Sequence, residues 1–185
     1  MAATFDKLFS IAGKVALVTG GSRGIGEMIA AGFLAQGAKV YISSRKAEAC
    51  DATAARLAAA YSGECVSIPA DLSKMDGVQA LAAALAARES RLDILINNAG
   101  ASWGAPLEAF PEIGWDKVMD TNVKAVFFLT QKLMPLLRAR RPASRRHGSS
   151  TSGRSTASRR RPSMPGRMAH RRRRCITSRA SWPRA

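Results

Sequence analysis

The stretch Thr19-Gly20-Gly21-Ser22-Arg23-Gly24-Ile25-Gly26 decides the fold of this chain. It follows a short apolar run at residues 15–18 and precedes an apolar segment with helical spacing at 28–34. A strand, a glycine-rich turn and a helix in this order are typical of a dinucleotide-binding turn. The glycines let the backbone approach a pyrophosphate, and the first N–H groups of the helix attract its negative charge.

Apolar runs and helical patterns alternate along the first three quarters of the chain. Strands are predicted at 14–19, 39–43, 65–69 and 92–96, and helices at 26–35, 47–61, 75–88 and 113–137. Gly37 is expected to end the first helix with a positive φ. This alternation predicts an α/β fold with a Rossmann-like, doubly wound parallel sheet. Because six or more strands would be needed, residues 1–137 are predicted to be its N-terminal half only.

The composition changes abruptly after Leu137. Residues 1–137 carry 13 acidic and 13 basic side chains, whereas 138–185 carry 16 Arg and no Lys, Asp or Glu. The second segment also lacks Leu, Val, Phe and Tyr, so it cannot bury enough apolar surface to fold alone. We therefore expect residues 138–185 to be a disordered tail. As an alternative function, such a tail would bind nucleic acid or other polyanions non-specifically and in a salt-dependent way.

The cysteines and the lengths of the apolar runs indicate the compartment of the protein and argue against a membrane span. The three cysteines, Cys50, Cys65 and Cys175, show no metal-ligand spacing and no even pairing, which favours a reducing, cytoplasmic compartment. No apolar run is long enough to span a bilayer, and no metal site is predicted.

A second motif, Asn97-Asn98-Ala99-Gly100, directly follows the fourth predicted strand. Together with the G-x-x-x-G-x-G turn preceded by Thr, it resembles the short-chain dehydrogenase/reductase family. The resemblance implies that Asn97 and Asn98 bond across neighbouring strands and line the cofactor cleft. It also implies a set of cofactor-binding residues: Gly20, Ser22, Arg23, Gly24, Ile25, Gly26, Asn98, Ala99 and Gly100.

The choice of cofactor is predicted from charge. NAD-selective enzymes usually carry an acid at the end of the second strand, but here Ser44 and Arg45 stand there. With Arg23 they suit the 2′-phosphate of NADP, unless Arg45 and Lys46 form only a solvated turn. Asp71 and Leu72 match the family's adenine-binding position. Alternatively, Asp71 caps the following helix.

Thr121-Asn122-Val123 matches the family's Asn-Val pair, which implies that Asn122 is catalytic and holds a water in a proton relay. Residues 100–104 also resemble reductases of rhamnolipid synthesis, which are similar to 3-oxoacyl-[acyl-carrier-protein] reductases. The implied substrate is a small-molecule or acyl-carrier-linked carbonyl. The family also tends to form homo-oligomers, and no membrane partner is implied.

The family's other catalytic groups are a Ser, a Tyr and a Lys four residues after the Tyr, and they are missing. The chain has only Tyr41 and Tyr61, and neither precedes a Lys at that spacing. For 147–158 and 167–178, a set of permitted codons can be chosen that encodes the missing groups when it is read one base earlier. The Ser then falls across Gly153 and Arg154, the Tyr across Arg167 and Met168, and the Lys across Arg171 and Arg172. We therefore interpret the tail as out of frame, and expect the chain to be inactive, with residues 14–19 left at an exposed sheet edge.

Overall fold

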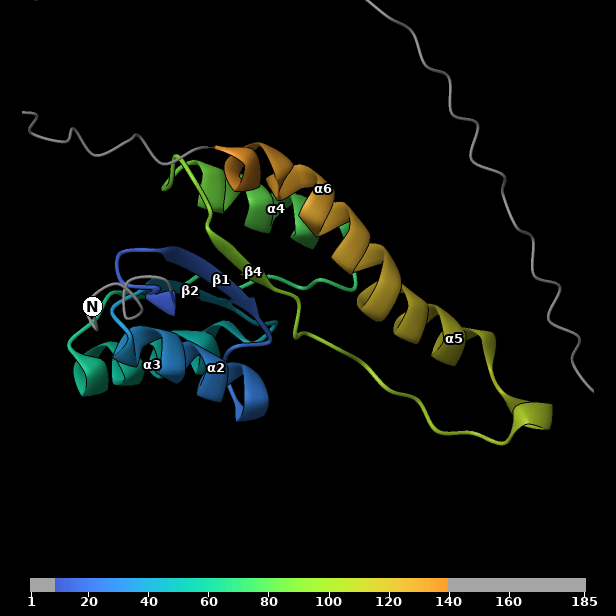
Figure 1. Cartoon of the computed structure of the whole chain (residues 1–185). Coiled ribbons are helices and arrows are strands. Elements are labelled where there is room, and N and C mark those ends of the chain that lie inside the picture. The colour runs from blue at the N-terminus through green and yellow to red at the C-terminus, as the bar shows by residue number, and fades with distance from the viewer. Residues whose placement is uncertain (1–8, 140–185) are drawn as a thin grey trace, which may run out of the picture. The chain divides into compact units, whose positions relative to one another are not determined.

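The computed structural model describes residues 9–139, which contain a four-stranded parallel sheet (Figure 1). The strands lie in the order β3-β2-β1-β4, and their bounds are Val15–Thr19 for β1, Lys39–Ser43 for β2, Cys65–Ser67 for β3 and Ile94–Ile96 for β4. The predicted parallel α/β sheet is confirmed. The expectation of an exposed first strand is wrong, because Ala16 pairs with Val40 of β2 on one side and Ile94 of β4 on the other.

Helices cover both faces of the sheet (Figure 1). One face is covered by α2 (Gly24–Ala35) and α3 (Ala47–Tyr61), and the other by α4 (Met75–Ala86) and α6 (Ala125–Arg138). Two apolar clusters result, because side chains alternate between the faces of a strand. Leu17 and Tyr41 pack towards α4 and α6, whereas Val18 and Ile42 pack towards α2 and α3.

The helix predicted over residues 113–137 is helical throughout but not regular. It consists of α5 (Glu112–Met119), a π-helical segment at Asp120–Lys124 and then α6. A π segment inserts extra backbone into a helix and is frequent at functional sites. The sequence pattern missed it, because the apolar spacing on either side remains helical.

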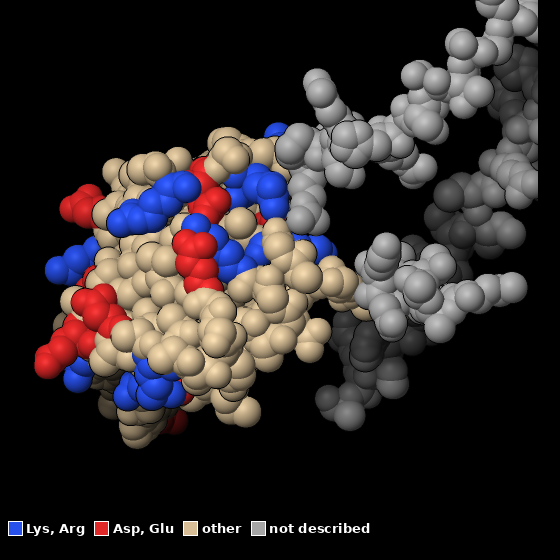
Figure 2. Space-filling model, turned by 90° about the vertical axis from the view of Figure 1, so that its left-hand side faces the viewer, with Lys and Arg blue, Asp and Glu red and all other residues tan. Residues whose placement is uncertain are grey.

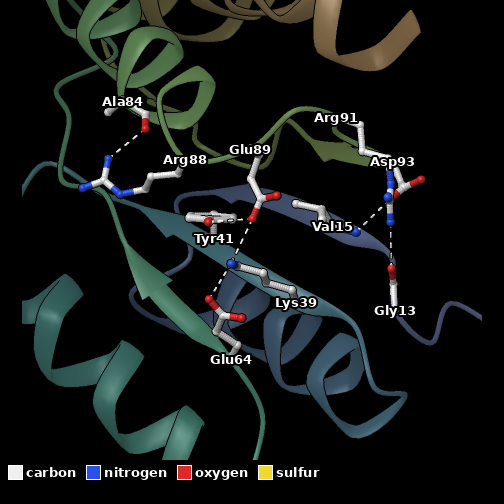
Figure 3. Close-up of polar contacts among 10 residues, drawn as sticks. All are labelled: Gly13, Val15, Lys39, Tyr41, Glu64, Ala84, Arg88, Glu89, Arg91 and Asp93. Carbon is white, nitrogen blue, oxygen red and sulfur yellow. Dashed lines mark hydrogen bonds and ion pairs between the residues drawn. The ribbon is translucent and has the colours of Figure 1, made fainter. Parts of the chain in front are cut away.

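A polar network closes the amino-terminal ends of the strands (Figure 3). The Lys39 ammonium lies 2.5 Å from a Glu64 carboxylate oxygen and 2.9 Å from one of Glu89, and the Tyr41 hydroxyl donates to Glu89 at 2.8 Å. Beside it, the Asp93 carboxylate accepts from the Val15 amide at 2.8 Å. These contacts tie β1, β2 and β3 to the segment that follows α4, at the end of the sheet opposite the glycine-rich turn.

Acidic and basic side chains alternate on the face of the molecule drawn in Figure 2. This mixture fits the balanced charge counted over residues 1–137. Within residues 9–139 no helix is long and apolar enough to cross a membrane. The predicted disorder and polyanion binding of the Arg-rich segment concern residues that, from 140 onwards, lie outside the described part of the chain.

Candidate functional site

The glycine-rich turn joins β1 to α2 in a conformation that requires glycine at two positions. Gly20 and Gly24 have φ values of +68° and +59°, in the left-handed region that favours glycine. The amides of Gly20 and Gly21 both donate to the Ser43 carbonyl, at 2.7 and 3.2 Å. The turn is therefore fixed against the end of β2, which brings the first two strand ends together.

The amino terminus of α2 is open to an anion. Its first residue follows Arg23, and no side chain among the described residues caps it. The Thr53 hydroxyl of α3 donates to the Ser22 carbonyl at 3.0 Å, which holds the loop in front of this helix end. Uncapped N–H groups and the helix dipole together favour a bound phosphate.

Asn98 connects the ends of β1 and β4. Its side-chain amide donates to the carbonyls of Thr19 and Gly20 at 3.0 and 3.3 Å. In return, the Thr19 hydroxyl accepts from the amides of Asn98 and Ala99, both at 3.0 Å. A Cβ at Gly20 would lie 2.9 Å from the Asn98 side-chain nitrogen, so this junction also depends on the glycine.

Asn97 does not share this role, and its predicted bond across neighbouring strands is wrong. Its side chain is exposed and donates to the Thr130 hydroxyl of α6 at 3.4 Å. It is not among the residues that line the cavity described next. The two adjacent asparagines therefore have different partners, since Asn98 meets the end of β1 and Asn97 meets α6.

A cavity of about 830 Å³ opens over the carboxyl ends of the strands. It is lined by the turn after β1, the end of β2, the segment after β3, the segment after β4 and the α5–π helix. The residues predicted from the sequence that line it are Gly20, Ser22, Arg23, Ser44, Arg45, Asp71, Leu72, Asn98, Ala99 and Gly100. Its size falls within the range of small-molecule and cofactor sites.

Basic side chains outnumber acidic ones in the lining of this cavity. Arg23, Arg45, Lys46 and Lys117 line it, whereas Asp71 is the single acidic residue that the described part of the chain contributes to the lining. None of these four cations pairs with a carboxylate of residues 9–139, although Lys39, Arg56, Arg91 and Lys124 all do. Basic groups that face a cavity without a carboxylate partner are suited to an anionic ligand.

Asp71 plays a local structural part as well as lining the cavity. Its carboxylate accepts from the backbone amide and the hydroxyl of Ser73, at 3.1 and 2.8 Å. The N-cap position of α4 belongs instead to Lys74, and no side chain there makes a capping bond. The predicted alternative of a helix cap is therefore wrong in detail, since Asp71 stabilises the turn that precedes the helix.

Asn122 lies in the π segment and is bonded to the loop that follows β4. Its side-chain oxygen accepts from the Ala101 amide, and its side-chain nitrogen donates to the Ala101 carbonyl, both at 2.8 Å. Asn122 does not itself line the cavity, but Ala101 and Thr121 do. The π segment thus places the predicted catalytic residue directly behind the cavity wall.

Besides Asn97 and Asn122, three predicted residues do not line the cavity, and several lining residues were not predicted. Gly24, Ile25 and Gly26 lie in the first turn of α2, and the Ile25 side chain is 71% exposed. The unpredicted residues are Ser43, Lys46, Ala49, Ala70, Ser73, Ala101, Lys117 and Thr121. Lys117 was detectable in principle, because it stands one helical turn before Thr121 and so shares its face.

Comparison with known proteins identifies similar chains. The family described as short chain dehydrogenase matches residues 14–157. A rhamnolipids biosynthesis 3-oxoacyl-[acyl-carrier-protein] reductase of Pseudomonas aeruginosa is 61% identical over 70% of this chain and 50% of the relative. A gluconate 5-dehydrogenase of Gluconobacter oxydans is 43% identical over 67% of this chain and 48% of the relative. The chain spans about half the length of these curated relatives.

Solved structures give the same picture. A Pseudomonas aeruginosa RhlG/NADP active-site complex is similar with a TM-score of 0.67 and 61% identity, over 70% of this chain and 50% of that one. The L-sorbose reductase of Gluconobacter frateurii, complexed with NADPH and L-sorbose, is similar with a TM-score of 0.68 and 29% identity, over 70% of this chain and 49% of that one. The similarity covers the Rossmann-like part that the sheet and helices form.

Proposed function

Because this chain belongs to the short-chain dehydrogenase family, we propose that it provides the NADP(H)-binding part of an oxidoreductase. The observation that carries this proposal is the cavity over the strand ends, whose lining among the described residues holds one acid and four cations that form no ion pair. A dinucleotide with a 2′-phosphate is a polyanion of suitable size. Similar solved structures are complexes with NADP or NADPH.

The residues present fit this cofactor. The positive φ of Gly20 and Gly24 and the uncapped start of α2 would receive the pyrophosphate. Arg23 and Arg45 would hold the 2′-phosphate, while the buried Leu72 offers an apolar surface to the adenine. When bound, the nicotinamide supplies a hydride.

For the reaction of the whole enzyme, we propose reduction of a 3-oxoacyl-type carbonyl. The support is the 61% identity to the reductase of that name and the resemblance of residues 100–104. Asn122, which the Ala101 backbone holds in one orientation, is the catalytic residue that this chain contributes. The Ser, Tyr and Lys partners would come from the reading frame that residues 138–185 have left, so the chain as written is inactive.

Two further proposals concern organisation. Residues 1–137 form the folded, cofactor-binding part and 138–185 an out-of-frame tail, whose arginines would bind polyanions only non-specifically. The intact enzyme is a cytoplasmic homo-oligomer. Trp115, Met119, Val123 and Phe127, which are 36–61% exposed and recur every fourth residue along α5, the π segment and α6, support self-association.

A titration of the chain with NADPH and NADH, followed by nucleotide fluorescence, tests the cofactor proposal. We expect NADPH to bind about tenfold or more tightly than NADH, because charge-assisted bonds to a phosphate are strong. Ser44→Asp should remove this preference by placing a carboxylate beside Arg45. Lys132→Ala, an exposed cation outside the cavity lining, serves as the control. Equal binding of both nucleotides would refute NADP selectivity and leave the family assignment intact.

A further inference from the structure

The loop between β4 and α5 contributes to the cavity yet has little packing of its own. In Figure 1 it leaves the carboxyl end of β4 and returns at α5, with a short 3-10 turn at Leu107–Ala109. None of residues 101–111 is buried, and the Leu107 side chain is 88% exposed. Among the described residues, Asn122 is the only one outside the stretch 101–111 whose side chain hydrogen bonds to that stretch.

Trp103 provides a second attachment. Its indole lies against Gly114, the one buried residue of α5, and a Cβ there would come within 2.7 Å of the ring. The Lys117 ammonium stands over the same ring, 5.1 Å from its centroid. The indole therefore packs in a space that is open because residue 114 is a glycine. Lys117, one helical turn further along α5, lies over the ring. We call this space at Gly114 and Lys117 the indole seat.

We propose that Trp103 is a positioning residue for the nucleotide site, an inference that rests on the proposed function. By fastening the loop to α5, it holds Ala101 in register with Asn122 and keeps Lys117 at the cavity wall. This attachment would fix the positions of three lining residues relative to one another: Ala101, Lys117 and Thr121. Loss of the indole would loosen this wall while leaving the sheet and the glycine-rich turn intact.

Amide hydrogen exchange and NADPH titration of the full chain test this role together. In Trp103→Ala we expect exchange of amides 101–110 to accelerate about tenfold, as the ring contact and the cation–π pair are lost. Amides of β1, β2 and α2 should exchange as before, and the dissociation constant for NADPH should rise. Trp103→Phe, which keeps a ring over Gly114, should restore most of both properties.

Two variants reach the same seat from the other side. Gly114→Ala places a methyl group in this space and should displace the indole. Helix α5 should stay formed in this variant, because alanine has a higher helix propensity than glycine. Lys117→Met should accelerate exchange of the loop by about two- to fivefold, whereas Lys117→Arg should not. Ile113→Ala is the control, because Ile113 also lies on α5, is 69% exposed, and belongs neither to the cavity lining nor to the exposed row of Trp115, Met119, Val123 and Phe127.

The outcomes separate this inference from the proposed function. If the unaltered chain binds neither nucleotide, the proposed function fails and this inference fails with it. If NADPH binds but Trp103→Ala changes neither loop exchange nor affinity, only the positioning role is overturned. Faster exchange throughout the sheet in Trp103→Ala would also overturn it, because Trp103 would then support the whole fold.

Discussion

At the scale of single residues, Asn98 joins the two strand ends on which the site is built. Its side-chain amide donates to the carbonyls of Thr19, the last residue of β1, and of Gly20, and its backbone amide donates to the Thr19 hydroxyl. We expect Asn98→Leu to lower the free energy of unfolding by about 2–3 kcal/mol, because half-buried carbonyls lose their donors. Urea denaturation measures this change.

Asn97→Ala is the matched control for this prediction. Asn97 is exposed and makes one long hydrogen bond, so its replacement should cost less than about 0.5 kcal/mol. Equal losses in the two variants would contradict the difference that we describe between the adjacent asparagines.

Tyr41 and Lys39 make stability depend on alkaline pH. Burial, and then the bond to Glu89, raise the pKa of Tyr41 above its ordinary value of 10.0, and the bond to Glu64 is the main cause that raises the pKa of Lys39 above 10.5. Both groups hold their protons more tightly when folded. Their stabilisation is therefore complete below pH 10 and is lost as pH rises through the raised pKa values.

The corresponding measurement is the free energy of unfolding between pH 8 and 11, the interval that brackets these ordinary pKa values. Tyr41→Phe should flatten the alkaline decline. Tyr61 is 43% exposed, so Tyr61→Phe should show the same alkaline decline in the free energy of unfolding as the unaltered chain. A decline of the same steepness in all three proteins would show that the network of Figure 3 does not couple folding to these protons.

At the scale of elements, the helix from α5 to α6 has one face buried in the core and one apolar face exposed to solvent. One face carries Ala125, Leu129 and Leu133, which are buried in the core beside α4. The other carries the exposed apolar residues Val123 and Phe127. A solvent-facing apolar stripe of this length is typical of an interaction surface.

We expect Phe127→Asp to shift the chain from oligomer to monomer, because it places a charge at the α6 end of the stripe that Trp115, Met119, Val123 and Phe127 form. Size-exclusion chromatography with light scattering measures the mass. Tyr61→Ser, at the end of α3 and far from the stripe in sequence, should leave the mass unchanged. An unaltered chain that is monomeric at all concentrations would argue against the surface.

At the scale of the whole molecule, the described strands stop at β4, whose outer edge has no partner among residues 9–139. An open strand edge is a template for further pairing. The out-of-frame reading of the tail yields an apolar stretch with Gly-Ser at its end and then Tyr-x-x-x-Lys. If our proposal for the tail holds, the shifted frame would supply the residues that extend the sheet and complete the site.

Restoring that frame gives the corresponding prediction. The repaired protein should reduce a 3-oxoacyl thioester with NADPH, and Asn122→Ala should lower its kcat by about 10²-fold or more if Asn122 takes part in proton transfer. The present chain should show no turnover under the same assay. Activity of the present chain that depends on Asn122 would overturn our interpretation of the tail. Coding DNA without Ser, Tyr and Lys codons in the shifted frame would do so equally.

Sequence periodicity predicted the sheet and its helices closely, because both depend on local patterns. The ranges 39–43 and 47–61 agree with β2 and α3 to the residue, and Gly37 has the positive φ expected of it. Strands β3 and β4 are shorter than predicted, since pairing with a neighbour and not apolarity alone sets where a strand ends.

The sequence by itself determined the parallel α/β class, the glycine-rich turn and the family, because these rest on spacing within short segments. Only the tertiary structure decided that β4 pairs with β1 and that Asn98, not Asn97, contacts the glycine-rich turn. It also decided that a π segment brings Asn122 into hydrogen bonds with Ala101. It also brought Lys117 and Trp103 together beside the cavity. These features depend on contacts between residues far apart in the chain, and such contacts leave no periodic trace in the sequence.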